Sequence, residues 1–113
     1  MRQQYKRATA LLEKGLEDMP ESILGHLHYG QALMALGKPE EAAKQFTHVI
    51  RLDRRFIIAY RHMGRVLAQL GRKEEAASIL RQAMALLLPE QAQGYELGLD
   101  LLLKRNPGQS IQI

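Results

Sequence analysis

Apolar side chains recur along the chain at intervals of three and four residues, the spacing of one face of an α-helix. Between residues 23 and 36 they include Ile23, Leu27, Leu33 and Leu36. The same spacing predicts further helices over about 3–18, 39–52, 57–70, 73–87 and 91–105. The alternation typical of a β-strand does not occur before the last few residues. The pattern therefore predicts an all-α fold of about six helices.

Glycine and proline mark the ends of these segments. Gly37 and Gly71 each follow a periodic run, at the place where many helices end in a left-handed residue. Pro39 stands in a first-turn position, which suits its fixed φ, and Glu40 and Glu41 follow it. Carboxylates are favourable there because the helix N-terminus carries a partial positive charge. We therefore expect short turns between antiparallel helices.

The sequence also repeats itself, with a period of about 34 residues. Gly30 recurs as Gly64 and Gly98, and Leu33 recurs as Leu67 and Leu101. The run Glu40-Glu41-Ala42-Ala43 recurs as Glu74-Glu75-Ala76-Ala77. Each period contains two of the predicted helices, so the repeating unit is a helix–turn–helix.

A helix–turn–helix of this length and residue pattern resembles the tetratricopeptide repeat. The residues that carry the resemblance are His26, Tyr29, Gly30, Leu33, Gly37, Ala42, Phe46 and Val49 in one copy, and Tyr60, Met63, Gly64, Leu67, Gly71, Ala76, Leu80 and Ala83 in the next. Two positions depart from the family pattern, since Arg54 replaces a proline and His26 replaces an aromatic residue. The resemblance implies a short right-handed α-solenoid that binds proteins and has no catalytic activity.

The resemblance also implies a division of the chain into repeats. A single domain over residues 1–105 would hold a half repeat at 3–22, full repeats at 23–56 and 57–90, and a half repeat at 91–105. The tail 106–113 alternates polar and apolar residues. It is interpreted either as a flexible segment or as a strap over the last helix.

Composition narrows the function classes. The 113 residues include no cysteine, which excludes disulfides and thiolate metal sites, and the net charge is only +4. No apolar run approaches the roughly 18 residues of a membrane span, and no secretory signal is visible at the N-terminus. We expect a cytoplasmic protein.

No set of residues indicates catalysis. His26 and His28 are two residues apart, so they point to nearly opposite sides of a helix and cannot share a metal ion. His28 and His62 occupy equivalent repeat positions, but no third ligand is evident near them. The acidic pairs at 40–41 and 74–75 are explained by helix starts. We expect no enzyme activity, no cofactor and no metal.

The resemblance implies a concave groove lined by the first helix of each repeat. The residues at the family's ligand-contacting positions are Leu27, His28, Gln31, Ile58, Arg61, His62, Arg65 and Tyr95. Arg61 and Arg65 lie one helical turn apart, which suits a partner peptide with a carboxylate and apolar anchors. The carboxylate clamp of chaperone-binding members is absent, because Leu27 and Gln31 occupy its positions.

The leucine-rich segment 91–105 suggests an alternative, a homodimer formed through Leu99, Leu102 and Leu103. A helical-repeat nucleic-acid binder is a weaker alternative. The few aromatic residues offer little stacking surface, and Arg51, Arg54, Arg55, Arg72 and Arg81 are scattered along the chain.

Overall fold

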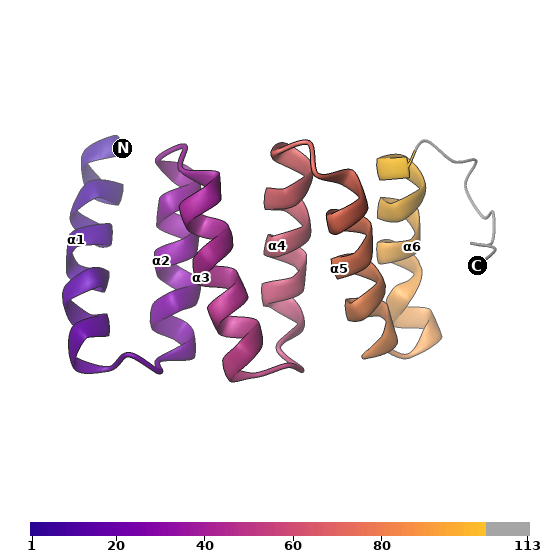
Figure 1. The fold of residues 1–113 in the computed structure, drawn as a ribbon, viewed down its shortest axis with the longest axis horizontal. Helices are drawn as coiled ribbons and strands as arrows, with labels where there is room; N and C mark the ends of the chain where they lie inside the picture. The colour runs from indigo at the N-terminus through magenta and orange to yellow at the C-terminus, as the bar shows by residue number, and fades with distance from the viewer. Residues whose placement is uncertain (104–113) are drawn as a thin grey trace.

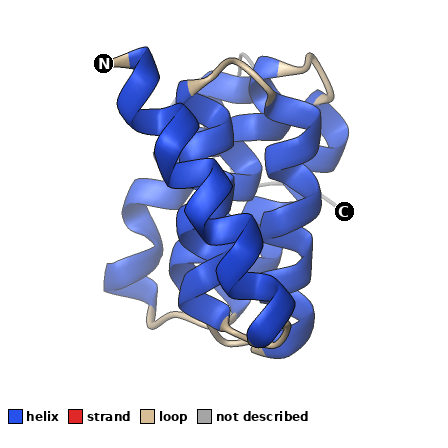
Figure 2. Cartoon of the chain, turned by 90° about the vertical axis from the view of Figure 1, so that its left-hand side faces the viewer, coloured by secondary structure: helices blue, strands red, loops and turns tan. Residues whose placement is uncertain are grey.

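The structure is a computed structural model that describes residues 1–103. In this range it contains helices and no strand, which confirms the predicted all-α class (Figure 2). The helices are α1 (Arg2–Asp18), α2 (Ile23–Ala35), α3 (Pro39–Leu52), α4 (Ile57–Gln69), α5 (Lys73–Ala85) and α6 (Pro89–Leu103). The tail 106–113 and the end of the predicted half repeat, 104–105, lie outside the described residues.

The helices form a single row in chain order (Figure 1). Each helix packs mainly on the helix before it and the helix after it. The helices α2 and α3 form one antiparallel hairpin, α4 and α5 form a second, and α1 and α6 stand at the two ends (Figure 1). An array of this kind buries its core between neighbours and exposes the outer sides of its two end helices.

The predicted glycine breaks are confirmed at the ends of α2 and α4. Gly37 and Gly71 have φ values of 73° and 76°. After α2, the N–H of Gly37 donates to Met34 O at 3.0 Å and the N–H of Lys38 donates to Leu33 O at 2.9 Å. These two bonds form a Schellman motif, which satisfies carbonyls that the helix leaves free. Pro39 then starts α3, so the turn of the hairpin is short.

The core lies between α2, α3 and α4. Phe46, Val49 and Ala42 on α3 are fully buried, and Leu33 and Val66 pack in the same cluster. Phe46 can approach α2 because Gly30 has no side chain, and a Cβ added at Gly30 would lie 2.6 Å from the Phe46 ring. The small residues of the repeat thus set the separation of the two helices.

The two residues that depart from the family pattern each take part in the same kind of contact, which recurs in successive repeats. The ring of His26 bonds Pro20 O through Nε2 at 2.7 Å, and one repeat later the hydroxyl of Tyr60 donates to Arg54 O at 2.7 Å. His26 therefore takes the place of the aromatic residue because its ring reaches the same backbone carbonyl. Arg54 takes the place of proline because this position supplies only its carbonyl oxygen.

Within residues 1–103, no helix is both long enough and apolar enough to cross a membrane.

Candidate functional site

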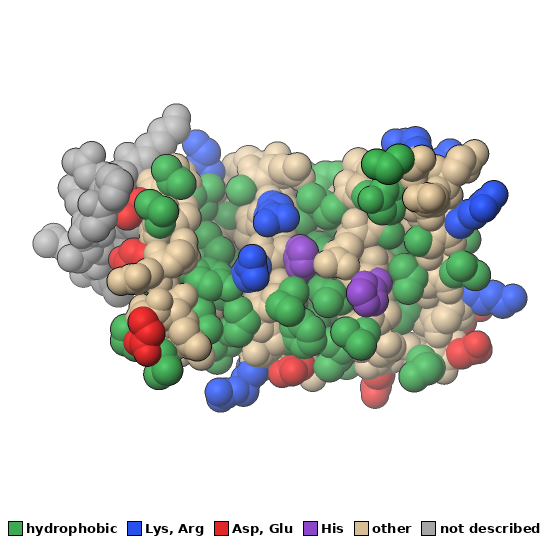
Figure 3. All heavy atoms as spheres, turned by 180° about the vertical axis from the view of Figure 1, so that it is seen from behind, with side chains coloured by type: hydrophobic (Ala, Val, Ile, Leu, Met, Phe, Trp, Pro, Cys, Tyr) green, Lys and Arg blue, Asp and Glu red, His purple; other side chains and the backbone are tan. Residues whose placement is uncertain are grey.

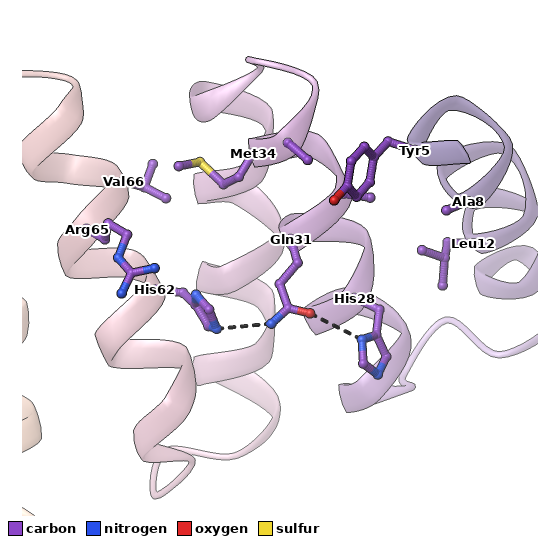
Figure 4. Close-up of a pocket in the computed structure, with 11 residues that line it drawn as sticks. Tyr5, Ala8, Leu12, His28, Gln31, Met34, His62, Arg65 and Val66 are labelled. Carbon is purple, nitrogen blue, oxygen red and sulfur yellow. Dashed lines mark hydrogen bonds between the residues drawn. The ribbon is translucent and has the colours of Figure 1, made fainter. Parts of the chain in front are cut away.

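A hollow of about 530 Å³ lies where α1, α2 and α4 meet (Figure 4). It is lined by Tyr5, Ala8, Leu12, His28, Gln31, Ala32, Met34, Ala35, His62, Arg65 and Val66. Apolar side chains from α1 and α2 form most of its wall, and polar side chains gather on α2 and α4 (Figure 4). A site of this mixed kind holds apolar groups by burial and orients them with a few polar contacts.

A chain of hydrogen bonds links the polar side chains of this hollow. Gln31 lies between two histidines (Figure 4). Its Oε1 lies 3.2 Å from Nδ1 of His28, and its Nε2 lies 3.1 Å from Nε2 of His62. With the amide in this orientation, Gln31 donates to an unprotonated Nε2 of His62 and accepts from Nδ1–H of His28. The chain therefore joins α2 to α4 across the hollow.

The surroundings of His62 favour its neutral form. Burial lowers its pKa below the ordinary value of 6.5, and the positive charges of Arg65 and Arg61 lower it further. The His62 ring also stacks on Phe46, with ring centroids 5.1 Å apart and an angle of 13° between the planes. The neutral ring suits this contact with the core, and it agrees with the acceptor role of its Nε2 toward Gln31.

A second hollow, of about 380 Å³, lies between α4, α5 and α6. It is lined by Arg61, Arg65, Leu80, Gln91, Gly94, Tyr95 and Gly98. Arg65 lines both hollows, so they adjoin at this residue. Burial raises the pKa of the Tyr95 hydroxyl, while the neighbouring charge of Arg61 opposes that rise. We call the two hollows together the groove.

Arg61 and Arg65 project from α4 in the middle of the groove. Both side chains are exposed, and within residues 1–103 neither forms an ion pair. Figure 3 shows basic and histidine side chains together among hydrophobic ones in the middle of one face of the molecule. This arrangement places positively charged hydrogen-bond donors beside apolar surface. A carboxylate with apolar neighbours requires both.

The structure brings most of the predicted groove residues together. His28, Gln31, His62 and Arg65 line the first hollow, and Arg61 and Tyr95 line the second together with Arg65. Ile58 lies near the start of α4 with its side chain exposed, and it lines neither hollow.

The structure does not place Leu27 in the groove, where the sequence predicted it, because its side chain is only 5% exposed. It belongs to the core cluster instead. The equivalent residue one repeat later is Arg61, which is exposed. An apolar side chain at this position packs inward between helices, whereas a guanidinium extends into water. The repeat position alone therefore does not determine which side chain reaches the groove.

The structure does not place Leu99 on the self-association surface predicted from the sequence, because its side chain is fully buried. It shares one side of α6 with Ala92, two helical turns earlier, and both face into the molecule. Leu102 and Leu103 are half-buried, and the most exposed leucines of α6 are Leu97 and Leu101. The sequence indicated an apolar excess on this helix, but it did not indicate which side faces outward.

Three groove residues on α1 were not predicted: Tyr5, Ala8 and Leu12. They line the hollow because α1 has no helix before it in the described chain, so one side of it stays open. The signal was present in the repeat register, since Ala8 and Leu12 lie one repeat before Ala42 and Phe46. In α3 those positions face the preceding helix and are buried.

A further hollow, of about 520 Å³, contains the remaining histidines. The rings of His26 and His48 stack there with centroids 4.1 Å apart, and Nδ1 of His26 lies 2.7 Å from Oε1 of Gln45. Burial is the main cause of a lowered pKa at His48, with a smaller effect from His26. No group of three or more potential ligands among residues 1–103 is placed to hold a metal ion.

The chain is similar to known proteins both in sequence and in architecture. Two family models, each described as a tetratricopeptide repeat, match residues 1–61 and 58–82. No curated protein matches the chain. Among solved structures, the type III secretion translocator chaperone SycD of Yersinia enterocolitica superposes with a TM-score of 0.81 at 19% identity. That match covers 89% of this chain and 73% of SycD.

Two structures of MamA are also similar, each with a TM-score of 0.79 and 23% identity. The matches cover 88% and 89% of this chain, but only 57% and 54% of the MamA chains. At these identities, the likeness to SycD and MamA shows a common fold.

Proposed function

Because the chain belongs to the tetratricopeptide repeat family, we propose that it is a non-catalytic scaffold that binds a peptide segment of a partner protein in its groove. The observation that carries the proposal is the position of Arg61 and Arg65 in the middle of the groove, where Arg65 lines both hollows and Arg61 lines the second. A carboxylate placed on these arginines would have apolar surface on either side of it. Charge-assisted hydrogen bonds of this kind are stronger than neutral ones, and a guanidinium binds a carboxylate through two of them.

The apolar walls indicate what else the partner needs. Leu12, Met34 and Val66 line the hollow on one side of Arg65, and Leu80 and Tyr95 line the hollow on the other side. A peptide with an Asp, a Glu or a terminal carboxylate and an apolar side chain a few residues away would contact both kinds of surface. The groove is short, so we expect micromolar affinity for an isolated peptide, about −8 kcal/mol.

A peptide selection tests this proposal. Random peptides displayed on phage are selected on the parent protein, and the best binders are synthesised and measured by fluorescence anisotropy. We expect peptides with an acidic residue beside an apolar one. The double variant Arg61→Glu with Arg65→Glu should weaken their binding at least tenfold, because it replaces attraction by repulsion while changing only exposed side chains.

The matched control reverses two exposed arginines away from the groove, Arg72 and Arg81. It changes the net charge by the same amount, so a general charge effect would weaken binding equally in both variants. Circular dichroism confirms that both variants remain helical. Peptides that lose affinity with the control pair and keep it with the groove pair would place binding on another surface and refute the proposal.

A further inference from the structure

The space beside Gly98 on α6 is open, whereas the space beside the equivalent glycine of each helical hairpin is filled by a side chain. A Cβ at Gly30 would lie 2.6 Å from Phe46, and a Cβ at Gly64 would lie 3.0 Å from Leu80. In each hairpin, therefore, the second helix places a large side chain over the glycine of the first. A Cβ at Gly98 meets nothing within 4 Å in the described chain. In residues 1–103 no helix follows α6 to supply that side chain.

The leucines of α6 show the same missing contact. Leu101 lies one repeat after Leu67 and two repeats after Leu33, which are 2% and 3% exposed, yet Leu101 itself is 71% exposed. Leu97 on the same side of the helix is 51% exposed. The outer side of α6 is therefore shaped to pack on a second helix of the repeat and has none in the described chain.

The outer side of α1 is complementary to it, because α1 corresponds to a second helix without a first. Leu12 lies one repeat before Phe46 and two repeats before Leu80, at the position that covers the glycine. The neighbouring Leu11 is 71% exposed. A Cβ at Gly15 would contact nothing within 4 Å, whereas the equivalent residues Val49 and Ala83 are fully buried.

Charges distinguish the two ends. Helix α6 carries Glu90 and Glu96 on its less buried sides and no Lys or Arg up to Leu103. Helix α1 carries the exposed basic residues Arg2, Lys6, Arg7 and Lys14 together with the exposed acidic residues Glu13, Glu17 and Asp18, so four positive and three negative side chains leave a net charge of +1. Figure 3 shows Lys and Arg side chains at the α1 end, with some Asp and Glu side chains beside them, and Asp and Glu side chains at the α6 end.

We propose that the chain associates head to tail, with α1 of one copy packing antiparallel on α6 of the next as α3 packs on α2. In this register Leu12 covers Gly98 of the neighbouring copy, and the exposed leucines of both helices become buried. In this arrangement the net positive side-chain charge of α1 packs beside the net negative side-chain charge of α6. This self-association contact shares Leu12 and Gly98 with the lining of the groove, and it goes beyond the proposed peptide binding.

The symmetry of the contact follows from the same residues. A two-fold dimer through α6 alone would leave the outer side of α1, with the exposed Leu11 and the open space at Gly15, uncovered. A head-to-tail contact joins two different surfaces and leaves one of each free, so it continues from copy to copy as concentration rises, into open chains or into a ring where the rotation between copies closes.

A complementation experiment tests the proposal. The tail variant carries Leu97→Asp with Leu101→Asp on α6, and the head variant carries Leu11→Asp with Gly15→Asp on α1. All four changes are at exposed or open positions, so each variant should keep its helical circular dichroism. In analytical ultracentrifugation at about 100 μM, we expect the parent to sediment above its monomer mass of 12.8 kDa. Each variant alone should be monomeric.

The decisive sample is the equimolar mixture of the two variants. It retains one intact α1 surface and one intact α6 surface, so it should form a complex of twice the monomer mass and no longer species. The control Leu24→Asp with Ile58→Asp, which changes two exposed apolar residues away from both outer surfaces, should associate like the parent.

Three outcomes would each overturn the proposal. A monomeric parent would mean that something other than a second copy covers these surfaces. A head variant that still associates would indicate a two-fold contact through α6. A mixture that remains monomeric would show that the α1 and α6 surfaces do not bind each other.

Discussion

At the residue scale, the packing of this protein depends on glycines that face large side chains. Gly30 lies against the ring of Phe46, and Gly64 lies against Leu80. The Phe46 ring is fully buried, whereas Leu80 is only half-buried and ends in a flexible branch. The same sequence position can therefore tolerate very different substitutions in successive hairpins.

An alanine series at the three equivalent glycines measures this difference. Alanine favours a helix over glycine by up to about 1 kcal/mol. At Gly30 we expect overpacking against Phe46, about 1–3 kcal/mol, to exceed that gain and lower the free energy of unfolding. At Gly64 the two effects should nearly cancel, and at Gly98, where the space is open, Ala should stabilise the chain. Urea denaturation of the three variants at low protein concentration gives the comparison. Equal effects at Gly30 and Gly98 would contradict this account of the packing.

The lowered pKa values of His48 and His62 predict how stability depends on pH. The folded chain resists protonation of both rings, whereas the unfolded chain takes up protons at the ordinary pKa of 6.5. Below about pH 6.5 the unfolded state thus binds more protons, so the free energy of unfolding should fall as the pH falls. We expect a lower thermal midpoint at pH 5 than at pH 7.5, measured by circular dichroism. The double variant His48→Gln with His62→Gln should show a smaller difference between the two pH values, and an unchanged difference would assign the effect to other groups.

At the scale of single helices, the turns are held by local hydrogen bonds that differ from one helix to another. The helices α2 and α4 both end in a positive-φ glycine. At helix starts the chain is less uniform, because Ser22 caps α2 with its side chain whereas α3, α4 and α5 begin without a side-chain cap. The Ser22 hydroxyl accepts from the N–H of Gly25 at 2.9 Å. Helix α2 therefore has a start signal that the other internal helices lack.

Removal of this cap should be measurable. We expect Ser22→Ala to lower the free energy of unfolding by about 1 kcal/mol, because the N–H of Gly25 loses its partner at the start of the helix. Ser22→Asp restores an acceptor and should recover most of the loss. Urea denaturation of the two variants checks this prediction, and equal stabilities for Ala and Asp would indicate that Ser22 acts through packing alone.

At the scale of the whole molecule, stability is distributed along a row of neighbours. Each helix packs chiefly on adjacent helices, so a helix in the middle of the row has two interfaces and each end helix has one. The consequence is clearest at α1, which contains no buried residue, whereas α3 contains four. The two ends of the row are thus its least protected parts, and they are also the surfaces proposed for self-association.

Hydrogen exchange followed by mass spectrometry should show this gradient. In dilute protein we expect amides of α1 to exchange at least tenfold faster than those of α3, because α1 can open without disrupting the Phe46 cluster. At high concentration the protection of both α1 and α6 should increase together if the copies join head to tail. Uniform protection along the row at low concentration would contradict the local view of its stability.

The sequence by itself determined the helices, their order and the family. Apolar spacing and punctuation by Gly37, Pro39 and Gly71 placed the starts and ends of the helices within a few residues of the structure. These signals are local, because a helix end depends on the backbone conformation and hydrogen bonds of a few consecutive residues. The repeat period then implied stacked hairpins, since equivalent residues make equivalent contacts.

Only the tertiary structure decided which side chains remain accessible. Leu27 and Arg61 share a repeat position, as do Leu99 and Arg65, yet in each pair the leucine is buried and the arginine is exposed. Tyr5, Ala8 and Leu12 joined the groove because of where α1 lies against α2 and α4. Burial depends on how neighbouring helices rotate and approach until their side chains fit, and this packing is a property of the whole row.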